Sequence, residues 1–265
     1  MCIAYLAIQA HPDWPLFIAA NRDEFHARAA RFAAPWLRRP DIIAGIDEVA
    51  HGTWLGITRQ GRYAFLTNYR DLSAFRAQAP SRGELSSRYL EGQESPRDYV
   101  HHAAASAQAY NGFNLIVGDL SSAFYLGNCP PPGQTRELGS GRYVISNHLL
   151  DTPWPKAERL RQALGIYPSE ALQHSLDPVF DILKDGTQAS DADLPATGLS
   201  LERERLLSSP FIISPDYGTR CSTIIAVHRS GRAILSETSY APDGRPTQRH
   251  DWPFVIEPPA GASGT

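Results

Sequence analysis

The sequence predicts an α+β fold in which helices cover antiparallel sheets on their outer sides. Two observations support this prediction: strand-like segments come in pairs joined by short turns, and helix-like segments come in blocks between those pairs. A parallel sheet would instead place a helix after each strand. The 265 residues are enough for one full core, and they contain no repeat and no linker long enough to divide them. We therefore expect one domain over residues 1–257 and a flexible tail over residues 258–265.

The first predicted hairpin runs from "CIAYLAIQA" through the turn "HPDWP" to "LFIAANRDE". Both strands are apolar at nearly every residue, which is typical of a sheet covered on both faces. If the turn is centred near Asp13, the numbers of paired residues add to about 26. Cys2 then lies opposite Glu24 or its neighbours, so the polar "NRDE" stretch is placed beside the start of the chain.

A second hairpin is predicted in "GTWLGITRQGRYAFLTNYRD", with Gln60 and Gly61 as a two-residue turn. Its register pairs Trp54 with Thr67. Asn68 is then left at the end of a strand, where its side chain amide is available to a site.

Helices are predicted in "SRGELSSRYLEG", "SPRDYVHHAAASAQAY" and "TPWPKAERLRQALG". Ser95 and Pro96 suit the cap and first turn of the second helix, and Thr152 suits the cap of the third. Strands are expected in "FNLIVGD", "AFYLGN" and "RYVISNH". Residues 168–209 predict short helices joined by a polar loop. A last hairpin, turning at Ser230 and Gly231, is followed by a strand in "DWPFVI".

Composition and motifs exclude several classes of function. A net charge of -3 disfavours a general nucleic-acid or anionic-membrane binder, and no apolar run is long enough to span a bilayer. The N-terminus has no basic segment of the kind that precedes a secretory signal, so we expect a cytoplasmic protein. No GxGxxG, GxxxxGK[ST], HExxH or GxSxG motif occurs. The adjacent His101 and His102 point in different directions on a helix, so we expect no metal site and no required cofactor.

The three cysteines are Cys2, Cys129 and Cys221, an odd number without CxxC spacing. They suit neither a disulfide framework nor a zinc site. Cys129 and Cys221 are best interpreted as a loop thiol and a small core residue. Cys2 differs because it directly follows the initiator methionine.

Removal of Met1 would leave Cys2 with both a thiol and a free α-amine. An amine with a pKa of about 8 can take the thiol proton and later protonate a leaving group. Arg22 would favour the thiolate, and Asp23 would hold the amine or the guanidinium. Asn68 and Asn147, both at predicted strand ends, would supply the neutral donors that an oxyanion needs.

The same residues also have an ordinary structural interpretation. A cysteine at position 2 is usually a small buried residue, an Arg-Asp pair is usually structural, and asparagines at strand ends usually cap turns. The coincidence of Cys2 with a polar cluster across a hairpin keeps the functional interpretation open.

The stretches "MC", "NRDE", "GTWLGITRQGRYAFLTNYRD", "SRGEL", "YNGFNLIVGD", "SNHLLDTPWPKAERL" and "YGTRCSTIIAV" resemble the NRDE-motif family, also called the transport-and-Golgi-organisation family. That family is similar to N-terminal-nucleophile hydrolases of the choloylglycine hydrolase and penicillin V acylase type. The resemblance covers nearly the whole chain and is weakest over residues 166–210. It implies a four-layer αββα sandwich of two antiparallel sheets flanked by helices.

The resemblance also implies roles for individual residues. Cys2 would be the nucleophile, Asp23 the partner of its amine, Asn68 and Asn147 the oxyanion and substrate-orienting groups, and Arg220 a late arginine that supports the nucleophile. Residues expected to bind substrate are Asn21, Arg22, Glu24, Tyr69 and Arg70.

The spacing of the early arginine departs from the acylase pattern. The acylases separate it from its aspartate by two residues, whereas Arg22 and Asp23 are adjacent. Neighbours on a strand point to opposite faces, so both can face Cys2 only if the strand bulges or has ended. Which of the two faces Cys2 is left open.

Three hypotheses follow. The first is a hydrolase acting on a linear amide or thioester of a small acylated molecule. The second is a non-catalytic binding and trafficking protein for haem, acyl-coenzyme A or lipid, as the resemblance implies, with Cys2 as an axial ligand for haem and with Arg70 and Arg82 receiving phosphate or propionate groups. The third is an interaction protein; its five tryptophans are better explained as core anchors.

Overall fold

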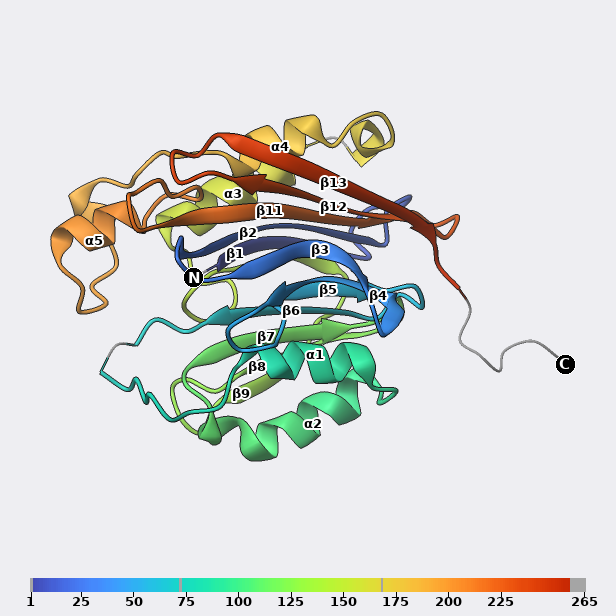
Figure 1. Cartoon of the computed structure of the whole chain (residues 1–265), viewed down its shortest axis with the longest axis horizontal. Helices are drawn as coiled ribbons and strands as arrows, with labels where there is room; N and C mark the ends of the chain where they lie inside the picture. The colour runs from blue at the N-terminus through green and yellow to red at the C-terminus, as the bar shows by residue number, and fades with distance from the viewer. Residues whose placement is uncertain (1, 72, 168, 258–265) are drawn as a thin grey trace, which may run out of the picture.

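The computed structural model describes residues 2–71, 73–167 and 169–257, in which two antiparallel sheets pack face to face with helices on both outer sides (Figure 1). The predicted α+β class and its four αββα layers are confirmed. Met1 and the predicted tail, residues 258–265, lie outside the described residues. No helix among the described residues is long and apolar enough to cross a membrane.

The first sheet has six strands in the order β10-β1-β2-β11-β12-β13, and helices α3 and α4 cover its outer face. Its elements are β1 (Cys2–Ile8), β2 (Leu16–Phe25), β10 (Gly141–Ile145), β11 (Tyr217–Val227), β12 (Arg232–Tyr240), β13 (Pro246–Val255), α3 (Pro155–Gly165) and α4 (Asp177–Leu183).

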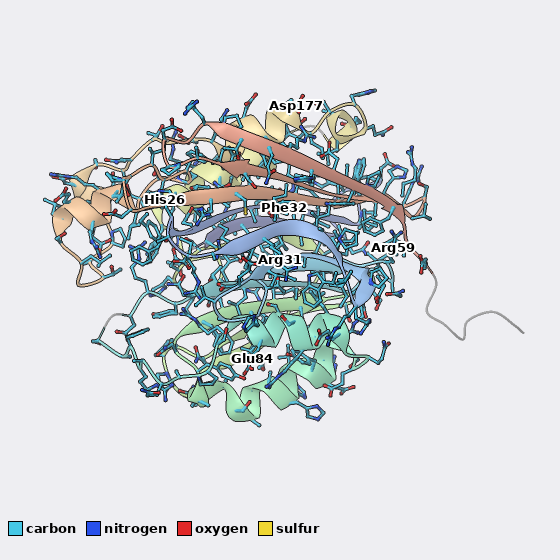
Figure 2. All side chains as sticks on the ribbon, viewed as in Figure 1. His26, Arg31, Phe32, Arg59, Glu84 and Asp177 are labelled. Atoms are coloured by element: carbon cyan, nitrogen blue, oxygen red, sulfur yellow. The ribbon has the colours of Figure 1, made fainter. Side chains whose placement is uncertain are left out.

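The second sheet has seven strands in the order β3-β4-β5-β6-β7-β8-β9, and helices α1 and α2 cover its outer face. Its elements are β3 (Ala30–Trp36), β4 (Arg39–Asp47), β5 (Leu55–Thr58), β6 (Tyr63–Asn68), β7 (Phe113–Gly118), β8 (Ala123–Gly127), β9 (Gln134–Glu137), α1 (Gly83–Glu91) and α2 (Pro96–Ser106). Figure 2 shows the side chains that fill the space between the layers.

The register of the first hairpin differs from the predicted one. Cys2 pairs with Arg22, and Ile8 pairs with Leu16, so the numbers of paired residues add to 24 and Glu24 is not the partner of Cys2. The connection over residues 9–15 is centred one residue earlier than predicted, and it closes through a bond from Gln9 N to Pro15 O (2.8 Å). A register shift of two residues, unlike a shift of one, keeps the same side chains on each face of the sheet.

The second hairpin is offset by one residue. Leu55 pairs with Phe65, so Trp54 does not pair with Thr67. The loop has three residues, 59–61, because Thr58 N bonds to Arg62 O (2.7 Å) and Gly61 adopts a φ of +84°. This is a type I turn followed by a left-handed glycine, not a two-residue turn. Asn68 is the last residue of β6, as predicted.

The predicted N-terminal cap of α2 is confirmed, whereas the predicted N-terminal cap of α3 is wrong. The Ser95 side chain accepts from Asp98 N (3.1 Å), which confirms the predicted cap. Thr152 is not the cap of α3: the cap position is Trp154, without a side-chain bond, and Thr152 Oγ1 pairs with His148 Nδ1 (2.9 Å). The Thr152 hydroxyl therefore contacts a residue of the preceding loop and does not cap the helix.

The remaining elements follow the predictions in outline. Residues 169–209 form short helices, including α4 and α5 (Leu201–Leu206), and β11 and β12 form the predicted closing hairpin. Residues 30–47, for which we predicted no element, form β3 and β4. β3 contacts β12 and β13 and so links the two sheets along one side.

Candidate functional site

The candidate site lies at the end of the sandwich where β1 begins and β2 and β6 end, close to the label N in Figure 1. Cys2 is buried on the face of its sheet that packs against the other sheet. Directly paired residues of an antiparallel sheet share a face, so Arg22 lies on the same side as Cys2 and Asp23 points to the opposite side. The alternation therefore answers the open question: Arg22 shares the face of Cys2.

The surroundings of Cys2 favour a protonated thiol at rest. Burial is the largest influence and raises the pKa of Cys2; the charge of Asp23 also raises it, whereas Arg22 and a backbone hydrogen bond from Asp23 lower it. Arg22 itself lies over the Trp54 ring at 4.3 Å and 3.5 Å from Asp47 Oδ2. Forming a thiolate here thus requires an acceptor for its proton.

Asp23 is buried on the helix-facing side of β2. Its Oδ1 accepts a hydrogen bond from Thr219 Oγ1 (2.7 Å). Burial raises the pKa of Asp23, and Lys156 is the largest of the neighbouring charges that lower it. Asp23 therefore belongs to a buried set of charges and not to the protein surface.

Lys156, which we did not predict as a site residue, is the second residue of α3 and has only 1% of its surface exposed. Its Nζ donates to Asn147 Oδ1 (3.3 Å), and Asn147 Nδ2 donates to Asn68 Oδ1 (3.1 Å). A signal was present: Lys156, Leu160 and Leu164 recur every four residues and form the buried stripe of α3. A lysine on that stripe needs buried partners.

A cavity of about 480 Å³ opens beside this network. Its wall combines apolar side chains with charged and amide groups. The lining residues are Glu24, Phe25, Asn68, Tyr69, Arg70, Asp71, Ala74, Phe75, Arg82, Asn111, Gly112, Cys129, Leu199, Arg203, Leu206, Leu207, Ser214, Pro215, Asp216 and Tyr217. Cys2 is not one of the described residues that line the cavity. Arg82 and Tyr217 do line it; burial lowers the pKa of Arg82 and raises that of Tyr217, and the charge of Cys2 acts to raise both.

Arg70 is the most deeply buried cation of the cavity wall. Its side chain is 3% exposed and its Nη1 pairs with Glu204 Oε2 at 2.9 Å. The guanidinium lies over the Trp154 ring at 4.8 Å. Its Nε and Nη2 have no hydrogen-bond acceptor among residues 2–71, 73–167 and 169–257. Unpaired buried donors are costly, so this arginine is suited to receive oxygen atoms of a ligand.

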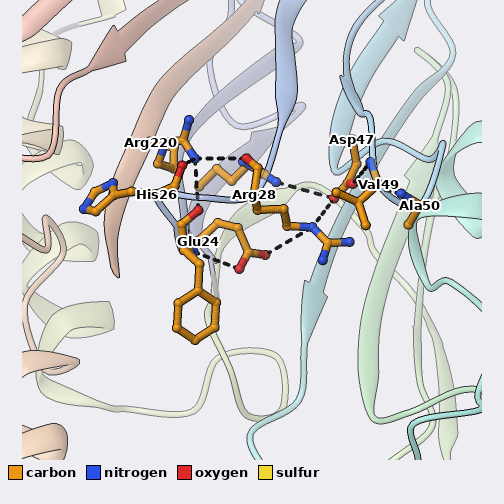
Figure 3. Close-up of polar contacts among 9 residues, drawn as sticks. Glu24, His26, Arg28, Asp47, Val49, Ala50 and Arg220 are labelled. Atoms are coloured by element: carbon orange, nitrogen blue, oxygen red, sulfur yellow. Dashed lines mark hydrogen bonds and ion pairs between the residues drawn. The ribbon is translucent and has the colours of Figure 1, made fainter. Parts of the chain in front are cut away.

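A network of hydrogen bonds and ion pairs surrounds the C-terminal end of β2 and the turn that follows it (Figure 3). Arg28 Nε lies 2.7 Å from Asp47 Oδ2 and 3.9 Å from Glu24 Oε2. Arg220 stands at a bulge of β11 and donates from Nη1 to the carbonyl oxygens of Phe25, His26 and Arg28 at 3.0–3.1 Å. Arg220 thus holds the turn after β2, and its predicted support of the nucleophile stays a prediction.

The predicted site residues fall into two groups. The cavity wall contains Glu24, Asn68, Tyr69 and Arg70, together with Arg82. Asn21 lies elsewhere: its Nδ2 donates to Leu183 O and Pro210 O, and its Oδ1 accepts from Ser222 Oγ, so the amide is used inside the fold. No group of three His, Cys, Asp or Glu side chains within the described ranges is arranged to hold a metal ion.

The family model and the relatives found by sequence agree on one family. A family model described as "Transport and Golgi organisation 2" matches residues 1–242. Two relatives named "Transport and Golgi organization protein 2 homolog" are 35% identical over 266 residues (Bos taurus) and 34% identical over 260 residues (Homo sapiens), each over 90% of this chain and 93% of the relative. The solved structure of a Caenorhabditis elegans N-acylethanolamine-hydrolyzing acid amidase ortholog aligns with a TM-score of 0.49 and 11% identity, over 84% of this chain and 92% of that chain.

Proposed function

This chain belongs to the Transport and Golgi organisation 2 family, and we propose that it is a cysteine-dependent hydrolase of a linear amide or thioester of a small acylated molecule. The observation that supports this most is the buried thiol of Cys2 at the start of β1. At the same end of the sandwich, the side-chain amides of Asn147 and Asn68 are linked by a hydrogen bond, and Asn68 lines a cavity. An attacking group and a neutral donor are thereby held at one end of the sandwich.

The reaction needs one proton acceptor and one oxyanion donor. After removal of Met1, the α-amine of Cys2 takes the thiol proton, and the sulfur forms a bond to the acyl carbonyl carbon. The carbonyl oxygen becomes an oxyanion and accepts a bond from Asn68 Nδ2. When the carbonyl reforms, the bond to the amine or thiol leaving group breaks, and the α-ammonium protonates that group. Water then attacks the carbonyl carbon of the acyl-cysteine while the α-amine takes a proton from it. The C–S bond breaks, the carboxylic acid leaves, and the proton returns from the α-ammonium to the thiolate.

The cavity favours an amphipathic substrate. Phe75, Leu206 and Leu207 supply apolar surface for an acyl chain, whereas Arg70 and Arg82 supply cations at the inner wall. A carboxylate or phosphate group on the substrate would satisfy Nε and Nη2 of Arg70, which have no other acceptor among the described residues. All three cysteines are free thiols, which is usual in a reducing compartment, so a cytoplasmic location is part of the proposal.

The first test compares cysteine variants. Cys2→Ala should abolish hydrolysis of decanoyl-coenzyme A and of a decanoyl anilide, because it removes the attacking sulfur, whereas Cys221→Ala should keep it. Intact mass of untagged protein establishes whether Met1 is removed, and rapid quenching should trap a decanoyl adduct on Cys2. Equal rates for the Cys2→Ala variant and the wild type, or a fully active protein that retains Met1, would overturn the proposal.

A second candidate function is binding and trafficking of an anionic, amphipathic ligand such as acyl-coenzyme A, lipid or haem. It is supported by the two unpaired donors of buried Arg70 in the cavity wall. Under this alternative, Cys2 serves as a ligand for haem iron or as a core residue, and no turnover is expected.

The binding function predicts a ligand-dependent rise in melting temperature. Palmitoyl-coenzyme A or hemin should raise the melting temperature of the wild type. The shift should be lost in the double variant Arg70→Met/Glu204→Gln, which removes the anion-binding donors without leaving a buried unpaired charge. The exposed pair Arg97–Glu137, changed in the same way, is the matched control. An undiminished shift in the Arg70 variant would contradict the assignment.

A further inference from the structure

Two amides in series connect Lys156 of α3 with the cavity. We propose that Lys156 is a positioning residue that holds Asn147 and Asn68 so that Asn68 Nδ2 faces the cavity as a donor. The inference rests on the proposed function of the same site, and it adds a residue that acts from the outer helical layer.

The chemistry of the donors sets the direction of the series. An ammonium group has donors and no acceptor, so Asn147 must turn its Oδ1 toward Lys156 Nζ (3.3 Å). Ser146 Oγ lies 3.2 Å from this Oδ1 and 3.2 Å from Cys2 O, and its single proton is shared between the two acceptors. A flipped amide would bring Nδ2 against the ammonium, where two donors meet. The Nδ2 group of Asn147 is therefore directed away from Lys156.

The next amide follows from the first. Asn147 Nδ2 donates to Asn68 Oδ1 (3.1 Å) and lies 3.2 Å from Asn68 O. The Oδ1 of Asn68 is thus occupied, and its Nδ2 has no hydrogen bond within the described ranges of the chain. Because Asn68 lines the cavity, Nδ2 is the group that it offers to a ligand. A substrate carbonyl oxygen needs such a donor, whereas an exposed Oδ1 would repel it.

The series crosses from one sheet to the other. Lys156 lies on α3, Asn147 follows β10 of the six-stranded sheet, and Asn68 ends β6 of the seven-stranded sheet. A backbone bond from Arg70 N to Asn147 O (2.7 Å) holds the two strand ends together. Backbone contacts fix the positions of the two asparagines, and Asn68 O, 3.2 Å from Asn147 Nδ2, also favours the observed orientation of the Asn147 amide. The donor of Lys156 acts on the other end of the same amide and favours the same orientation.

Two substitutions separate the donor of Lys156 from its charge. Lys156→Gln keeps an N–H donor for Asn147 Oδ1 without the charge, whereas Lys156→Met keeps the length and loses the donor. We expect Lys156→Met to lower kcat for decanoyl-coenzyme A by about 10²–10³, as loss of an oxyanion donor does, with little change in KM. Lys156→Gln should recover most of this loss. Thermal unfolding of both variants establishes that they are folded.

A second measurement needs no turnover. In protein labelled with ¹⁵N-asparagine, the side-chain amide signals of Asn68 and Asn147 should shift strongly in Lys156→Met and weakly in Lys156→Gln. Asn128, whose Nδ2 donates to Ala107 O (2.9 Å) and whose Oδ1 accepts from Phe113 N (2.7 Å), is the buried control and should not shift. If the wild type hydrolyses nothing, the proposed function fails while these spectra still test the inference.

Two results would overturn the inference. One is a wild-type kcat and unshifted amide signals in Lys156→Met. The other is an equal loss of kcat in Lys156→Met and Lys156→Gln, because the charge of Lys156, and not its donor, would then be the property that matters.

Discussion

Burial is the main influence on the titration of the Cys2 thiol. Burial has the largest effect on the pKa of Cys2 and raises it; Asp23 also raises it, whereas Arg22, on the same face of the sheet, lowers it. A thiolate here would be a charge in a buried place, which is costly. An α-amine on Cys2 would place a positive charge beside that thiolate once it takes the proton. The site therefore favours a proton transfer within it over a thiolate that persists at rest.

The titration of Lys156 gives a pH dependence at the level of one residue. Burial lowers the pKa of Lys156 to about 8, whereas an unfolded lysine titrates near 10.4. Between these values the unfolded chain binds more protons than the folded chain, so this group makes the free energy of unfolding rise with pH, by at most about 1.4 kcal/mol per unit. Below pH 8 both states carry the proton, and the cost of burying the charge is constant.

Denaturant unfolding of the wild type and Lys156→Met should reveal this rise as a difference. The wild type should gain stability relative to the variant from about pH 8 to about pH 10. Taking the difference between the two proteins reduces the contribution of Cys2. The raised pKa of Cys2 acts in the opposite direction, because it makes the free energy of unfolding fall with pH. A stability difference that does not change with pH would contradict the buried, partly neutral lysine.

At the scale of secondary-structure elements, the hairpins β5–β6 and β11–β12 are closed by the same kind of turn. Gly61 and Gly231 each end a three-residue loop with a φ of +84°, where a side chain is strained. A Cβ at Gly61 would also lie 2.9 Å from Leu120 Cγ, whereas at Gly231 the nearest atom is 3.8 Å away. The two positions therefore separate backbone strain from steric conflict.

Alanine substitutions at these glycines should be ranked by urea unfolding. Gly231→Ala should cost about 1–2 kcal/mol for the left-handed conformation, and Gly61→Ala should cost more because Leu120 must move. Gly139 is exposed, and a Cβ there would meet no atom of the described residues within 4 Å, so Gly139→Ala should change stability by less than about 0.5 kcal/mol. Equal costs for Gly61→Ala and Gly139→Ala would contradict the turn assignment.

At the scale of the whole molecule, one buried carboxylate joins the two sheets. Glu237 on β12 accepts from Thr223 Oγ1 (2.7 Å) in its own sheet and from Ala33 N (2.6 Å) on β3 of the other sheet. Trp252 Nε1 adds a bond to Ala33 O (2.8 Å). These contacts join the two sheets along the β3 side, and none of Glu237, Ala33 and Trp252 lines the cavity.

The sequence by itself determined the pairing of neighbouring strands, the helix blocks and the meeting of Cys2 with the "NRDE" stretch. It also placed Asn68 at a strand end. These features depend on residues close together in the chain: alternation, apolar runs and turn residues act locally, and a hairpin brings its own ends together whatever the exact register. The family resemblance supplied the four layers.

Only the tertiary structure decided which groups share a face and a cavity. The face of Arg22 follows from a register that a seven-residue connection sets, and turn composition did not specify it. Lys156 meets Asp23 and Asn147 because α3 packs on the six-stranded sheet, and Arg70 meets Glu204 across 134 residues. Such contacts arise from the packing of whole layers, in which the burial of apolar faces brings polar groups together that no local pattern links.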